Sequence, residues 1–320
     1  MAGDVRPGTA RAATRPSVPA MLAVTAVWGL CFVGIRWGLR DAPVLWFAAL
    51  RSGVAGLALL VYGTAQRRRS PRTPQGWALV GALAVTNSGI AFAAMFAGVA
   101  GLAAGVAAVL ANAQPLLILL PAWWLYREPV SARTAVALGA GFAGLVLVAG
   151  TGGSGTGAVL SLLAAAAITA GTLLSRRIGT LDVVMVSGWH FLLGGAGLAA
   201  FAAMVEGAPR ITWTPRFVAI LAVLALLGTA WAFVVWFREA QRCELSVLSA
   251  WTFLTPVFGI GFAVVLLGER PSGWTAAGLG LVLVALWFVL RPRPATPPHP
   301  PPDPSSEPGR AVPARPRADG

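Results

Sequence analysis

The stretch AGVAAVLANAQP, at residues 104–115, has a counterpart in LSVLSAWTFLTP, at residues 245–256. Each stretch continues through an apolar run to a glutamate-containing turn and a further apolar segment. When the two copies are aligned without gaps, prolines, glutamates and glycines come into register: Pro115 with Pro256, Glu128 with Glu269, and Gly139 with Gly280. An internal repeat inside an apolar chain is typical of membrane transporters built from two related halves.

The composition excludes an ordinary soluble domain. Hydrophobic residues make up 57% of the chain, charged residues make up 11%, and the mean hydropathy is +0.75. Ten apolar segments are each about long enough to cross a hydrocarbon core of roughly 30 Å. These segments are residues 19–39, 43–63, 76–96, 104–125, 132–150, 158–177, 183–204, 217–237, 245–267 and 272–290.

The arginines predict the orientation of these segments. All 24 basic residues are arginine, and if the N-terminus is cytoplasmic, 18 of them lie inside, five lie outside and Arg51 lies within a helix. Cytoplasmic loops carry the excess of basic residues in membrane proteins. We therefore expect a multi-pass protein of the cell (inner) membrane with both termini in the cytoplasm. The net charge of +13 then reflects topology, and nucleic acid is not expected as a partner.

The expected fold is an all-α polytopic membrane protein with ten transmembrane helices in two inverted five-helix repeats. The repeats are inverted because five is an odd number of crossings. Residues 1–17 should be a disordered cytoplasmic N-terminus, residues 18–150 the first repeat and residues 157–290 the second. Residues 291–320 are rich in proline and should form a disordered cytoplasmic tail.

Arg51 and His190 are the ionisable residues near the middle of the predicted membrane region. A guanidinium there costs at least about 2.5–3.5 kcal/mol on insertion scales, so Arg51 should face a cavity or a partner. It could anchor an anionic group such as a carboxylate, or it could be a structural hydrogen-bond hub. His190, near the repeat-equivalent position in the seventh segment, could relay a proton or could be a neutral packing residue.

Further candidate residues lie in the middle of the apolar segments. Pro115 and Pro256 occupy matching central positions, where proline frees a carbonyl and kinks the helix, so we expect a role in gating. Together with Arg51 and His190, the expected solute-binding residues are Trp28, Asn87, Asn112, Gln114, Trp231, Trp251, Thr252 and Thr255. Glu128 and Glu269 lie in turns before the fifth and tenth segments, and we expect structural anchoring there.

No cofactor or metal site is expected. The chain has only two cysteines, Cys31 and Cys243, which allow neither a disulfide framework nor a metal cluster. The string Gly-Gly-Ser-Gly at residues 152–155 fits the G-x-S-G pattern of intramembrane serine proteases. Such a string arises readily by chance in a glycine-rich linker, and we do not expect an enzyme.

The arrangement of these residues resembles the EamA family of the drug/metabolite transporter superfamily. The resemblance covers about residues 18–290, and its elements are Trp28-Gly29-x-x-Phe32-x-x-x-Arg36, Pro43 with Arg51, and the doubled proline–glutamate segment. The glutamate turn matches closely in the second copy and less well in the first. The resemblance implies ten helices, a central cavity between two repeats, and export of small metabolites, amino acids or drugs.

We therefore expect a secondary transporter that works by alternating access, with the third, fourth, eighth and ninth segments around the cavity. Its expected partners are a small-molecule solute and the lipid bilayer, and the sequence leaves a homodimer open. Two alternatives are a membrane-embedded enzyme acting on lipid-linked substrates and a non-transporting membrane scaffold. The sequence does not indicate the solute, the direction of transport or the coupling ion.

Overall fold

The computed structural model describes residues 15–127, 131–149 and 155–290, and within these ranges it is built from helices with no strand. Glu128 and Ser154 lie outside the described residues, as do the two terminal segments at 1–14 and 291–320. The elements are α1 (Val18–Gly38), α2 (Val44–Ala65), α3 (Pro74–Leu83), η1 (Ala84–Ile90), α4 (Ala91–Gly101), α5 (Ala104–Ala111), α6 (Gln114–Leu117), α7 (Leu119–Tyr126), α8 (Ala132–Ala149), α9 (Thr156–Ser175), η2 (Arg176–Ile178), α10 (Val183–Val205), α11 (Pro215–Ala222), η3 (Val223–Trp231), α12 (Ala232–Arg242), α13 (Leu245–Ala250), η4 (Trp251–Phe253), α14 (Leu254–Leu267) and α15 (Gly273–Leu290).

Seven helical segments of the described chain are long and apolar enough to cross a membrane: Val18–Gly38, Val44–Ala65, Pro74–Gly101, Thr156–Ile178, Val183–Val205, Pro215–Arg242 and Leu245–Leu267. They correspond to seven of the ten segments expected from the sequence. The other three contain shorter helices. The expected segment at 104–125 is divided among α5, α6 and α7, while α8 and α15 contain the apolar stretches Ala135–Gly144 and Gly273–Ala285.

The interruption between α5 and α6 has a counterpart in the second copy of the repeat. Helix α5 ends at Ala111 and α6 begins at Gln114, just before Pro115; the 3₁₀ turn η4 ends at Phe253, shortly before Pro256. Proline lacks the N–H that would continue the helical ladder, and its ring clashes with the carbonyl four residues earlier. The two copies therefore leave regular α-helical geometry at nearly the same place.

A second pair of irregularities lies in the long segments 74–101 and 215–242. Each segment changes from an α-helix to a π-helix and back, at η1 in the first copy and at η3 in the second. The alignment that pairs Pro115 with Pro256 places η1 on residues 225–231, within η3. π-helical turns are rare and occur frequently at functional sites, so their recurrence at equivalent positions singles out both segments.

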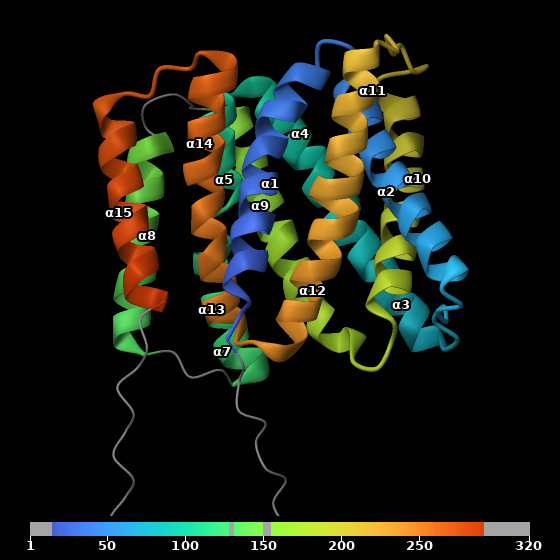
Figure 1. The fold of residues 1–320 in the computed structure, drawn as a ribbon, viewed down its shortest axis with the longest axis horizontal. Helices are drawn as coiled ribbons and strands as arrows, with labels where there is room; N and C mark the ends of the chain where they lie inside the picture. The colour runs from blue at the N-terminus through green and yellow to red at the C-terminus, as the bar shows by residue number, and fades with distance from the viewer. Residues whose placement is uncertain (1–14, 128–130, 150–154, 291–320) are drawn as a thin grey trace, which may run out of the picture. The chain divides into compact units, whose positions relative to one another are not determined.

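Equivalent parts of the two copies run in opposite directions in Figure 1. The chain rises from α3 to α4 in the first copy but descends from α11 to α12 in the second. It descends from α5 to α7 but rises from α13 to α14. The helix α1 begins, and α15 ends, at the lower edge of the same view. These directions are those of an inverted repeat.

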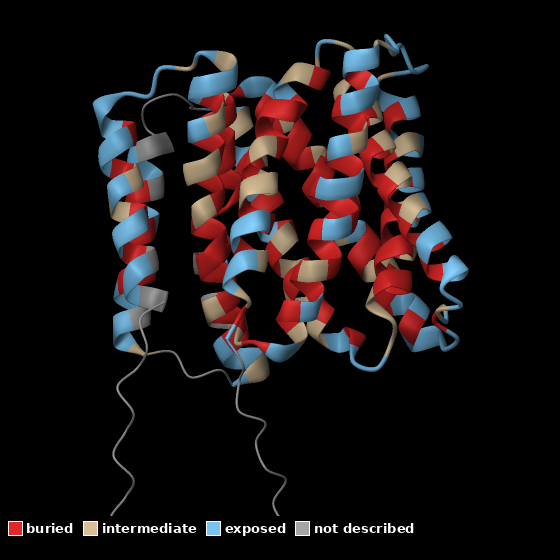
Figure 2. Ribbon diagram, in the orientation of Figure 1, coloured by how far each residue is buried: buried red, intermediate tan, exposed pale blue. Residues whose placement is uncertain are grey.

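Buried residues lie where the helices face one another, and exposed residues lie on the outside of the bundle (Figure 2). The buried set includes many small and aromatic residues, and many large apolar residues are exposed. Helix α2 packs along α10 through glycines: a Cβ added at Gly56 would lie 2.4 Å from the backbone nitrogen of Leu192, and one added at Gly195 would lie 2.7 Å from that of Gly53. Outward-facing side chains such as Leu57 and Val265 are exposed. Close packing through small residues and an apolar exterior are typical of helices in a bilayer.

Candidate functional site

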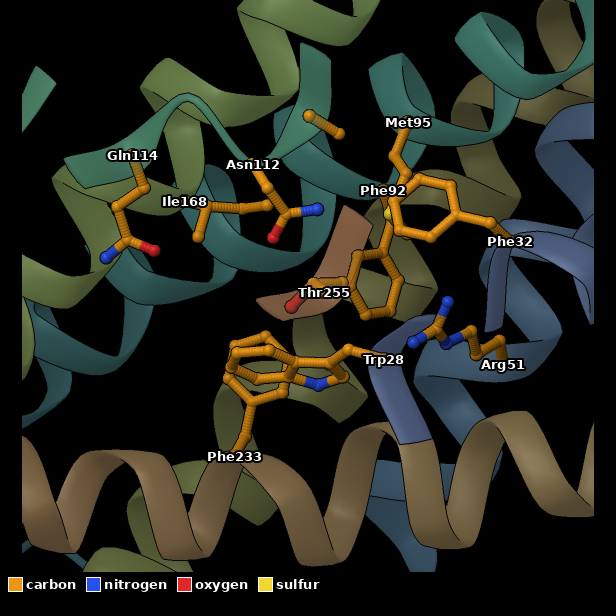
Figure 3. A pocket seen from close by; sticks show the side chains of 11 residues that line it. Trp28, Phe32, Arg51, Phe92, Met95, Asn112, Gln114, Ile168, Phe233 and Thr255 are labelled. Atoms are coloured by element: carbon orange, nitrogen blue, oxygen red, sulfur yellow. The ribbon is translucent and has the colours of Figure 1, made fainter. Parts of the chain in front are cut away.

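A cavity of about 50 Å³ lies among helices from both copies of the repeat (Figure 3). A buried water needs about 10–15 Å³ of such space, so the cavity has room for roughly three to five water molecules. Its lining comes from the first, second, third, fourth, sixth, eighth and ninth of the segments expected from the sequence. The lining residues are Trp28, Phe32, Arg51, Phe92, Met95, Ala111, Asn112, Gln114, Ile168, Phe233 and Thr255.

Arg51 is the only charged residue in this lining, and it is almost completely buried. Its Nε donates a hydrogen bond of 2.8 Å to Oγ1 of Thr229, and Nη2 donates one of 3.3 Å to the carbonyl oxygen of Gly228. The guanidinium carbon lies 4.7 Å from the ring centroid of Phe92, within the range of cation–π attraction. The remaining nitrogen, Nη1, is buried and has no hydrogen-bond partner among the described residues.

The π-helix η3 positions the groups that hold Arg51. Oγ1 of Thr229 donates to the carbonyl oxygen of Leu224, one wide turn earlier, at 2.9 Å, and this bond fixes the hydroxyl that accepts from Arg51. The carbonyl oxygen of Gly228 also accepts from Nε1 of Trp28 at 3.1 Å. The π-helix η3 thus orients Trp28 of α1 and Arg51 of α2.

The positive charge of Arg51 has no counter-charge among the described residues. No ion pair of the described chain includes Arg51, and no residue of the cavity lining is acidic. An arginine remains protonated even when it is buried. A buried charge without a partner is strongly unfavourable, so the site is suited to a ligand that brings negative charge.

Three polar side chains, those of Asn112, Gln114 and Thr255, line the cavity together with Arg51 (Figure 3). Oγ1 of Thr255 is buried without a hydrogen-bond partner in the described part of the chain. Nδ2 of Asn112 donates to the carbonyl oxygen of Ala108 at 2.7 Å, and Nε2 of Gln114 donates to Oγ1 of Thr172 at 2.9 Å. These bonds fix the two amides and leave their oxygens available to a ligand. Arg51 and Gln114 mark opposite ends of the view, with aromatic rings between them.

Five residues expected from the sequence therefore meet in one cavity: Trp28, Arg51, Asn112, Gln114 and Thr255. The third, fourth, eighth and ninth segments, which were expected around the cavity, contribute to its wall. The first, second and sixth segments do so as well. Pro115 and Pro256 directly follow Gln114 and Thr255 and are buried.

The other expected solute-binding residues do not line this cavity. Asn87 is buried at η1 against α9, where a Cβ at Gly171 would meet its amide. Nδ1 of His190 donates to the carbonyl oxygen of Val186 at 3.1 Å, and Oγ1 of Thr252 donates to the carbonyl oxygen of Ser249 at 2.7 Å. Trp251 is buried elsewhere, and the side chain of Trp231 is exposed.

Sequence reasoning missed the apolar part of the lining: Phe32, Phe92, Met95, Ala111, Ile168 and Phe233. Phe92 and Phe233 occupy equivalent positions in the two copies, and their pairing was a usable signal. The remaining four have the same sequence character as core residues.

Glu269 has a structural contact between the two copies. Its carboxylate oxygens accept hydrogen bonds from the backbone nitrogens of Ala104 at 3.1 Å and Gly105 at 3.3 Å, at the N-terminus of α5. A carboxylate at that end of a helix is favourable because it satisfies unpaired N–H groups. The described residues contain no group of three histidine, cysteine, aspartate or glutamate side chains that could hold a metal ion.

One family profile and several relatives match this chain. The profile of the EamA-like transporter family matches residues 15–150 and again residues 155–291. An uncharacterized transporter of Synechocystis sp. is 26% identical over 84% of this chain and 88% of its own length. A WAT1-related chloroplastic protein of Arabidopsis thaliana is 29% identical over 83% of this chain and 67% of its own length.

Two further matches extend this result. A protein of Salmonella typhimurium named "Probable amino-acid metabolite efflux pump" is 25% identical over 83% of this chain and 92% of its own length. A crystal structure with a TM-score of 0.71 covers 87% of this chain and 97% of that chain at 19% identity, which shows a shared fold. Because the family profile matches the chain twice and covers nearly all of its described part, this protein belongs to the EamA-like transporter family.

Proposed function

We propose that this protein is a secondary transporter that binds a small solute in the central cavity and moves it across the membrane by alternating access. The observation that carries the proposal is the charge of Arg51, which has no counter-charge among the described residues, in a cavity lined from both copies of the repeat. Binding sites of transporters lie at the interface of such repeats, often where helices are interrupted. The guanidinium of Arg51 attracts an anionic group of the solute.

The proposed architecture is ten membrane spans in two inverted repeats, at residues 18–150 and 157–290. The protein lies in the cell (inner) membrane, and both of its termini lie in the cytoplasm. The opposite directions of equivalent helices (Figure 1) and the arginine asymmetry support it. We expect reporter fusions after residue 320 to be active in the cytoplasm, and fusions within residues 151–157 to be active on the other side. A reporter at residue 320 that is active outside the cytoplasm contradicts the ten-span arrangement.

Export is the proposed direction, because the named efflux pump of Salmonella typhimurium is among the relatives. The family match also favours a transporter over the enzyme and scaffold alternatives. The test is to purify the protein, reconstitute it in liposomes loaded with a mixture of small metabolites, and identify by mass spectrometry which compounds leave. A transporter releases at least one compound unchanged, and faster than protein-free liposomes loaded with the same mixture do. A new compound, or no release above the empty control, contradicts the proposal.

A further inference from the structure

The charge of the cavity restricts the class of solute. Arg51 supplies one positive charge, and the other lining residues are uncharged. A monocarboxylate neutralises the site. A zwitterionic amino acid brings the same carboxylate together with an ammonium group, for which the lining has no carboxylate. Burying a charged group without an opposite charge is unfavourable, so the site discriminates against the ammonium.

The size and the polar groups of the cavity restrict the solute further. Space for roughly three to five water molecules suits a compound with a short carbon chain. Thr255 lines the same cavity as Arg51, and its hydroxyl, which has no partner among the described residues, can donate a hydrogen bond to the solute. Figure 3 shows the amide of Asn112 near Thr255 and the amide of Gln114 farther from Arg51. Their oxygens can accept a hydrogen bond from a hydroxyl group of the solute.

We infer that the solute is a small hydroxylated monocarboxylate without an ammonium group, of the size of glycolate or lactate. Its carboxylate neutralises the guanidinium of Arg51, its short carbon chain contacts the rings of Trp28 and Phe92, and its polar groups bind Thr255 and Asn112. This inference rests on the proposed function, because it names the solute class of the same cavity. It concerns selectivity within that function, so it can fail while the protein remains a transporter.

The test uses two matched pairs of radiolabelled probes: glycolate with glycine, and L-lactate with L-alanine. The members of each pair differ mainly in a hydroxyl group in place of the ammonium. Binding to the purified full-length protein in lipid nanodiscs is measured for all four. We expect glycolate and lactate to bind at least tenfold more tightly than glycine and alanine. Benzoate, a larger monocarboxylate, should compete at least tenfold more weakly than lactate.

Variants connect the selectivity to the cavity. Arg51→Gln should weaken lactate binding at least tenfold, and Thr255→Val, which removes the hydroxyl at nearly constant volume, should weaken it severalfold. The matched control is Arg216→Gln, because Arg216 is an exposed arginine paired with Asp41 at 2.9 Å, outside the cavity; it should bind lactate as the unchanged protein does. If Arg51→Gln fails to fold, the probe pairs and Thr255→Val still decide the question.

Several results would overturn the inference. Glycine or alanine binding as tightly as its hydroxylated partner removes the charge argument, and benzoate binding more tightly than lactate removes the size argument. If none of the four probes binds while reconstituted protein releases another metabolite from liposomes, the solute class is wrong and the proposed function stands. If no metabolite is released and no probe binds, both are wrong.

Discussion

Replacing Gly56 with alanine should sharply reduce the amount of folded protein. A Cβ at this position would lie 2.4 Å from the backbone nitrogen of Leu192 and 2.8 Å from the carbonyl oxygen of Gly188. Both atoms belong to the backbone of α10, so no side chain can move to make room, and α2 must separate from α10. Overpacking of this kind costs about 1–3 kcal/mol or more. The measurement is the thermal stability of the detergent-purified protein, with size-exclusion chromatography to determine the folded fraction.

The same helix offers a matched control for this prediction. A Cβ added at Gly53, nearly one turn earlier on α2, meets nothing within 4 Å. Gly53→Ala should therefore leave stability unchanged or raise it slightly, since alanine is a better helix former than glycine. Equal stability of the two variants would mean that the close approach of α2 and α10 does not hold the two copies together.

Replacing Arg51 with leucine should reduce transport at least tenfold while the protein still inserts and folds. Leucine is favourable in a bilayer, but it removes the bonds from Arg51 to Thr229 and Gly228 together with the free Nη1. Hydrogen bonds to charged groups contribute about 1.5–3 kcal/mol, which corresponds to a loss of roughly tenfold to more than a hundredfold in solute affinity. The measurement is initial uptake or release in liposomes at equal amounts of reconstituted protein.

Arg51→Lys separates the two reasons for this loss. Lysine keeps the positive charge but has no planar fork to bind Thr229 and the solute at the same time. We expect partial recovery relative to Arg51→Leu and not full activity. Full activity of well-folded Arg51→Leu would show that Arg51 is a packing residue and that the cavity binds its solute in another way.

The sequence predicted those parts of the site that the repeat itself marks. Pro115 and Pro256 have an obvious chemical effect on a helix, and the residues just before them, Gln114 and Thr255, line the cavity. A buried arginine is equally conspicuous. The expectation for Arg51 therefore needed only helix length and the energetics of charge in a bilayer.

The rest of the site depends on helix faces that sequence reasoning did not resolve. The alignment that pairs Pro115 with Pro256 pairs Arg51 with Leu192, and His190 lies two positions before Leu192. Because each residue of an α-helix turns by about 100°, a shift of two positions rotates a side chain by roughly 200°. His190 therefore points away from the position that corresponds to Arg51. The π-helices could not be predicted either, because residues 84–90 and 223–231 carry no distinctive sequence pattern. The role of Thr229 depends on the wide turn of η3, so it could not be predicted from the sequence.

The central claim is that both sides of the membrane have access to the same cavity in turn. The most direct test uses the variants Asn112→Cys and Thr255→Cys, each in a protein that also carries Cys31→Ser and Cys243→Ser. Each variant is reconstituted in liposomes, and a membrane-impermeant thiol reagent is added on one side or on the other. Val265→Cys, at a position 78% exposed on the outer face, is the control that should remain unlabelled. Alternating access predicts that both cavity cysteines react from each side and that bound solute slows both reactions. Labelling of both cysteines from one side alone, in protein that still transports, would contradict the account.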